Sequence, residues 1–273
     1  MHFQNLFSDV ERVIYRNNPL QSVICQLMFP PILSIESALP AAFQDKIRSD
    51  FPLFQAAAES DDIPLPPAIA ELIPQDLRQV LIASDRRRYQ FLSKDKNWTI
   101  TLARDFVALQ TRTYRRWEDF REHLEKMVHA LISVYAPDSI SRLGLRYQNA
   151  IDRNAMELAN VPWRDLIAPQ VLGPLGLPDY EPEIVEQNGV FSLSMNAAGD
   201  FIRVSHGLAH ASESQDSDLV FLLDNDLFTS DEVPAEVNNV ISRASEFNIL
   251  NRNFFRWCIL DPLHTAMGPE PAT

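Results

Sequence analysis

Two arginines on one predicted strand offer the most specific chemistry in this sequence. Arg142 and Arg146 have the same parity in an alternating apolar pattern, so they point to one face of a sheet. Gly144 between them leaves room for a ligand or a crossing backbone, and Asn149 adds an amide nearby. Two guanidinium groups can clamp a phosphate or a carboxylate. The alternative is that internal carboxylates neutralise both arginines, which makes them structural.

Basic residues next to aromatic rings suggest a second chemistry, the binding of single-stranded nucleic acid. Cations contact phosphates there, and rings stack on bases. If the two segments are adjacent, they make one patch. The alternative is an exposed turn and a helix start, with the rings in the core. The candidates are Arg86, Arg87 and Arg88 before Tyr89, and Arg115 and Arg116 before Trp117.

Two short acidic and histidine patterns are candidates for metal binding. Asp224 and Asp226 follow an apolar run, and oxygen ligands two residues apart at a strand end suit Mg²⁺. The alternative is a turn that leads into a helix. His206 and His210 are four residues apart, but we expect a strand that ends at Gly207 and leaves His210 in a loop. We therefore predict no bound cofactor.

Established catalytic motifs are absent from the sequence. It contains no Gly-rich phosphate loop, no nucleophile elbow and no His-Glu-x-x-His helix. Cys25 and Cys258 fall in apolar positions, where buried small side chains are expected. These residues leave open whether the protein is an enzyme.

The first half of the chain predicts strands followed by a long helix. Trp117 to Tyr135 has its apolar side chains on one face, and Pro137 ends the helix. We expect this helix to pack across an antiparallel meander. The other predicted elements are strands at Ser22–Phe29, Gln79–Ala83, Tyr89–Ser93, Trp98–Leu102 and Phe106–Thr113, and a short helix within Leu39–Asp50.

The second half repeats this order of elements. We expect a strand at Ser139–Ile151, a helical stretch at Met156–Leu172, strands near 184–195, 201–206 and 219–223, and a helix from about Pro234 to Cys258. The pattern predicts an α+β fold of antiparallel sheets, in two similar meander-plus-long-helix units with helices on one sheet face. The composition changes near residue 173, so we predict units at 1–172 and 173–273, either separate or in one continuous domain.

Charge and composition indicate the kind of partner. The chain has 273 residues and a net charge of −13, with −6 over residues 1–77, +6 over 78–153 and −13 over 154–273. An acidic protein repels nucleic acid, so we expect a protein partner of basic character, with a homodimer as the alternative assembly. Two cysteines, no signal-peptide pattern and no apolar run of membrane-spanning length predict a cytoplasmic protein without membrane contact.

Four segments carry a family resemblance that extends from about Tyr15 to Trp257. They read YRNNPLQSVICQLMFP from Tyr15, RLGLRYQNAI from Arg142, LDND from Leu223 and NFFRW from Asn253. On these segments the chain resembles an uncharacterised prokaryotic family described as sporadically distributed, although Gln148 stands where an apolar residue is expected.

The resemblance implies a cytosolic protein near 260 residues and brings no established reaction. A patchy distribution of a gene family is typical of mobile and antiphage defence genes. We therefore expect a non-enzymatic interaction or regulatory protein, an accessory component of a defence or toxin-like operon. The alternative is an enzyme or sensor that binds a phosphorylated small molecule or nucleic acid through the Arg142 and Arg146 pair.

Overall fold

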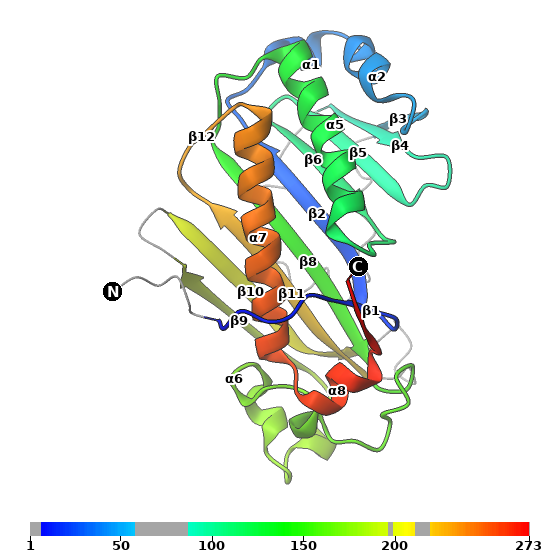
Figure 1. The fold of residues 1–273 in the computed structure, drawn as a ribbon, viewed down its shortest axis with the longest axis vertical. Coiled ribbons are helices and arrows are strands. Elements are labelled where there is room, and N and C mark those ends of the chain that lie inside the picture. The colour runs from blue at the N-terminus through cyan, green and yellow to red at the C-terminus, as the bar shows by residue number, and fades with distance from the viewer. Residues whose placement is uncertain (1–6, 58–86, 196–198, 211–218, 273) are drawn as a thin grey trace.

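A computed structural model of the chain describes residues 7–57, 87–195, 199–210 and 219–272, and all structural statements below concern these residues (Figure 1). The predicted strand at Gln79–Ala83 and the candidate Arg86 lie outside them.

Nine antiparallel strands form one continuous sheet (Figure 1). Successive side chains along each strand point to opposite faces of the sheet. We call the face that contacts the long helices the helix face, and the opposite one the far face. The strands in spatial order are β3 (Leu53–Ala57), β4 (Arg88–Leu92), β5 (Trp98–Ala103), β6 (Phe106–Thr111), β2 (Leu20–Met28), β8 (Arg142–Asp152), β11 (Leu219–Thr229), β10 (Asp200–His210) and β9 (Gln187–Ser194).

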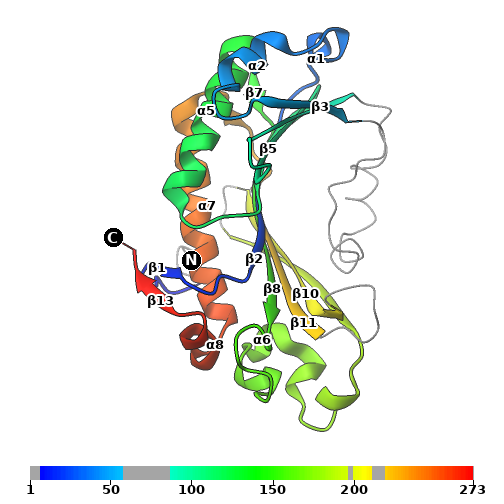
Figure 2. The ribbon, with the colours of Figure 1, turned by 90° about the vertical axis from the view of Figure 1, so that its right-hand side faces the viewer.

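Two long helices cover the same face of this sheet (Figure 2). Helix α5 (Trp117–Tyr135) and helix α7 (Val237–Cys258) lie side by side and run in opposite directions (Figure 1). The predicted α+β class is confirmed, with both helices packed on one face. None of the described helices combines the length and apolar composition needed to cross a membrane.

The order of elements is the same in the two halves of the chain. A strand, an insertion of short helices, a meander and a long helix follow one another from β2 to α5, and again from β8 to α7. The meander has four strands in the first half (β3 to β6) and three in the second (β9 to β11). Strands β2 and β8 pair antiparallel at the centre of the sheet, with Cys25 opposite Leu145. Because β8 precedes residue 173 and pairs with β11, which follows it, the sheet continues across the predicted boundary.

The smaller elements lie in the insertions and at the chain ends. Strands β1 and β13 pair with each other, as do β7 and β12. These elements are α1 (Leu33–Ser37), α2 (Ala41–Ile47), α6 (Pro169–Leu172), α8 (Asp261–Ala266), β1 (Val13–Tyr15), β7 (Ser139–Ile140), β12 (Val233–Pro234), β13 (Pro269–Pro271), and 3₁₀ helices at Trp163–Asp165, Gly173–Gly176 and Glu181–Glu183.

Two sequence predictions about element length are wrong. The stretch Met156–Leu172 holds only the 3₁₀ helix at Trp163–Asp165 and the short α6, because Pro162 and Pro169 cannot occupy a helix interior. Strands β10 and β11 are longer than expected and reach residues 210 and 229. The charged residues that seemed to end β11 lie within it, because their carboxylates find partners on the far face of the sheet.

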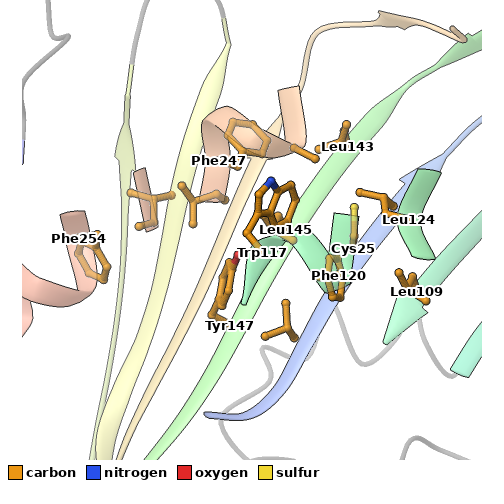
Figure 3. Close-up of a cluster of buried hydrophobic side chains, with 14 of the residues drawn as sticks. Cys25, Leu109, Trp117, Phe120, Leu124, Leu143, Leu145, Tyr147, Phe247 and Phe254 are labelled. Atoms are coloured by element: carbon orange, nitrogen blue, oxygen red, sulfur yellow. The ribbon is translucent and has the colours of Figure 1, made fainter. Parts of the chain in front are cut away.

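The main core lies between the sheet and the two helices (Figure 3). Phe120 and Leu124 of α5 and Phe247 of α7 are completely or almost completely buried there against Leu143 and Leu145 of β8. Cys25 and Cys258 are also buried and carry free thiols. This core holds β8 rigidly at the centre of the fold.

Candidate functional site

The two arginines of β8 lie on the far face, and each has a carboxylate partner on β11. Arg146 donates from Nε to Asp224 Oδ1 over 2.7 Å and from Nη2 to Asp224 Oδ2. Arg142 Nη2 lies 2.6 Å from Asp226 Oδ2. Both ion pairs are internal, so neither arginine is left to clamp a ligand by itself, and neither aspartate is left to hold a metal.

Burial strengthens the pair formed by Arg146 and Asp224, whose side chains are 22% and 7% exposed. Burial lowers the pKa of Arg146, but the charge and hydrogen bonds of Asp224, with Asp226 nearby, hold it above its usual value. The amide of Gln148 approaches Asp224 Oδ2 at 3.5 Å from the same face. This arrangement fixes charge in place and contributes to the specific pairing of β8 with β11.

The space above Gly144 is filled by this charge network. A Cβ atom at Gly144 would lie 2.5 Å from Nη1 of Arg142. The guanidinium carbon of Arg142 also lies 4.6 Å from the ring centroid of Phe228. The prediction that Gly144 leaves room for a ligand is therefore wrong, because Arg142 occupies that room.

Asn149 does not join the two arginines. Its parity in β8 places it on the helix face, where it is buried and donates from Nδ2 to the carbonyl of Leu223 over 3.0 Å. It lines a cavity between the sheet and the helices instead.

The predicted metal ligands are not brought together. His206 and His210 both lie in β10, so the expectation of a loop at His210 is wrong. Four residues span about 13 Å along a strand, too far for two ligands of one ion. Asp224 and Asp226 lie on the opposite face from His206. The described residues contain no group of three or more His, Cys, Asp or Glu side chains that could hold a metal.

The two basic groups lie at opposite ends of the meander. Arg87 donates to the carbonyl of Glu36, and Arg88 begins β4. Arg115 and Arg116 follow the opposite end of β6. The condition for one shared patch, that the two segments are adjacent, is not met for the described residues, because antiparallel pairing carries these segments apart.

Arg115 and Arg116 instead line the cavity that Asn149 lines, which we call the cationic cavity. It has a volume of about 230 Å³ and lies between β8, the second half of α7, the start of α5 and the segment around β1. Five arginines of this cavity come from three different segments of the chain: Arg12, Arg115 and Arg116, and Arg252 and Arg256. Sequence reasoning missed Arg252 and Arg256, although their four-residue spacing on a predicted helix was a signal.

Tyrosine and asparagine side chains complete the cationic cavity. Tyr114 and Tyr147 both donate a phenol hydrogen to Oδ1 of Asn248, at 3.3 and 2.9 Å. Burial raises the pKa of both phenols, so they stay protonated at neutral pH. The hydroxyl group of Tyr15 makes a hydrogen bond of 2.8 Å with Nδ1 of His264, and burial raises the pKa of Tyr15 to about 12.

The other surface of interest is residues 177–194, which we call the β9 surface. Strand β9 forms one edge of the sheet, and among the described strands it pairs only with β10 (Figure 1). Four exposed apolar side chains lie within it: Leu177 (52%), Tyr180 (59%), Val185 (74%) and Val190 (49%).

Comparisons with known proteins assign no family to this chain. No family model matches the sequence, and a search of curated proteins finds no match. Membership of the sporadically distributed family stays a prediction.

Proposed function

We propose that this protein is a non-enzymatic interaction or regulatory protein that binds a basic protein partner at the β9 surface, where the partner adds a strand to β9. The observation that carries this proposal is an eight-residue edge strand with no charged residue and no proline, QNGVFSLS.

An unprotected edge strand is unusual in a protein that acts alone. Outward N–H and C=O groups of an edge pair readily with another chain, so most proteins shorten such strands or place Lys or Pro on them. The other edge of this sheet, β3, has five residues within the described part of the chain. Strand β9 has none of these protections, which supports its use as a template for a partner strand.

Exposed apolar area supports the same surface. Four of the nine large apolar side chains that are exposed in the described residues lie between Leu177 and Val190. Concentrations of this kind are typical of protein contact sites. They would gain free energy by leaving water when a partner binds.

The charge of the surface indicates the chemistry of the partner. Residues 177–194 contain four acidic side chains and no Lys or Arg. Glu181 is used internally, because it contacts Arg153 at 3.3 Å and Arg164 at 3.4 Å. Asp179, Glu183 and Glu186 are exposed and attract a basic segment.

The alternative, ligand clamping by Arg142 and Arg146, loses support from their ion pairs with Asp226 and Asp224. We further propose a cytosolic location, which the two free cysteines support, and a role as an accessory component of a defence or toxin-like operon, which only the family resemblance supports.

Native mass spectrometry of the full chain purified gently from its host tests this proposal. We expect a stoichiometric complex with a basic protein that is lost in Glu183→Lys/Glu186→Lys. The matched control, Asp45→Lys/Asp138→Lys, makes the same charge change at exposed acids outside the β9 surface and should keep the partner.

Hydrogen exchange on the recovered complex then tests the strand addition. The partner should slow exchange of the β9 amides. A chain that stays monomeric, a homodimer that survives the Glu183→Lys/Glu186→Lys change, or a partner that leaves β9 exchange unchanged would overturn the proposal.

A further inference from the structure

We propose that the cationic cavity binds a small phosphorylated molecule through its phosphate group. This site lies on the helix face and shares no residue with the β9 surface, so the proposal does not depend on the partner.

Hydrogen-bond donors of α7 are left over in this cavity. Asn248 uses Oδ1 to accept from Tyr114 and Tyr147, and Asn251 uses Oδ1 to accept from Asn225 at 3.2 Å. Neither Nδ2 group has an acceptor among the described residues. Asn251 is only 7% exposed and lines the cavity, so its amide N–H groups can donate to a group bound there.

Arg252 supplies an unpartnered charge next to these amides. It lies one residue after Asn251, lines the cavity, and makes no hydrogen bond or ion pair with any described residue. Its Nε is buried without an acceptor. A buried cationic donor of this kind is stabilised by an anion.

The charge balance of the cavity favours an anion. Carboxylates outside the cavity hold three of its arginines: Glu118 holds Arg12, Asp119 holds Arg116 and Asp261 holds Arg256. Arg115 and Arg252 have no such partner among the described residues. Glu11, which is exposed, is the one acidic side chain in the lining.

Helix α5 adds to this positive potential. Its first residue, Trp117, lines the cavity, and no side chain caps its N-terminus. The N-terminal end of a 19-residue helix attracts negative charge.

Volume and donor number together point to a phosphate. The cavity holds about 230 Å³, less than the ~300–1,000 Å³ typical of pockets for drug-sized molecules. The amides of Asn248 and Asn251 and the guanidinium groups of Arg115 and Arg252 offer more hydrogen-bond donors than the two oxygens of one carboxylate can accept. A phosphate group has three terminal oxygens and up to two negative charges, so it matches these donors better.

Calorimetric titration of the full chain with inorganic phosphate tests the proposal. We expect saturable binding that weakens about tenfold or more in Arg252→Gln and less in the exposed Arg115→Gln. Arg112→Gln is the matched control, because it removes an exposed arginine that does not line the cavity, and it should bind phosphate as the unchanged chain does. Circular dichroism checks that each variant folds.

Titrations with malonate and chloride under the same conditions test the ligand class. Tighter binding of malonate than of phosphate would overturn the assignment to phosphate. Absence of phosphate binding at millimolar concentration, or equal binding by Arg115→Gln, Arg252→Gln and the control, would overturn the site.

Discussion

The ring of His206 lies directly over Gly189 of the neighbouring strand, so that a Cβ atom at Gly189 would be 2.6 Å from two ring atoms. His206 is buried, and its ring also approaches Phe191 and Phe221. It cannot move aside easily. The contact between His206 and Gly189 therefore packs β9 against β10 at the edge of the sheet where we place the partner.

The first prediction is that Gly189→Ala destabilises the fold by about 1–3 kcal/mol, because the added methyl overpacks the site. Urea denaturation measures the effect. Gly176→Ala is the control, since a Cβ there meets only ordinary contacts with Leu172 and should cost less. In a chain that already carries His206→Ala, the change Gly189→Ala should cost less stability than it does alone. An equal cost in the two chains would contradict the overpacking explanation.

The second prediction concerns the ion pair between Arg146 and Asp224. Arg146→Met removes the guanidinium and leaves a buried carboxylate unpaired, which we expect to cost about 3–5 kcal/mol of unfolding free energy. Denaturant midpoints measure this change. Arg16→Met serves as the control, because its contact with Glu270 is exposed and should contribute under 1 kcal/mol. Equal effects of the two substitutions would contradict a structural role for Arg146.

The third prediction is a loss of stability in mild acid that depends on His206. Burial lowers the pKa of His206 below 6.5, so the folded chain favours the neutral ring. The unfolded chain binds a proton near pH 6.5, and stability is therefore full above that pH and falls as the pH drops toward the folded pKa.

Denaturant midpoints measured between pH 8 and pH 5 give the slope of stability against pH. His206→Phe, which keeps a ring of similar size, should make the slope shallower. Some slope should remain, because burial also lowers the pKa of His264. An unchanged slope in His206→Phe would show that His206 does not contribute.

The fourth prediction is that neither cysteine reacts with a thiol reagent in the folded chain. Both are buried, and burial raises the pKa of Cys25 to about 12 and that of Cys258 above its usual value. Little thiolate forms at pH 8. Absorbance after addition of an aromatic disulfide reagent should rise only when denaturant unfolds the chain, and fast labelling of one thiol without denaturant would contradict this.

Local patterns of residues predicted the helices and strands whose formation depends on neighbouring residues. Apolar spacing and Pro137 predicted helix α5 with its bounds, and the alternating patterns predicted β2 and β8 with ends that differ from the structure by up to three residues. Such patterns are local, because they follow from the period of the helix or strand. The order of elements was enough to indicate an α+β fold with two similar halves.

The contacts of the polar residues, in contrast, depend on how distant segments pack together. Asp224 lies 78 residues after Arg146 in the chain, and the cationic cavity joins Arg12 to Arg252 and His264. These contacts depend on which strands pair and which helix faces meet, and those choices are set by long-range burial that a local pattern does not contain. For the same reason, the edge position of β9 appeared only once all nine strands were placed.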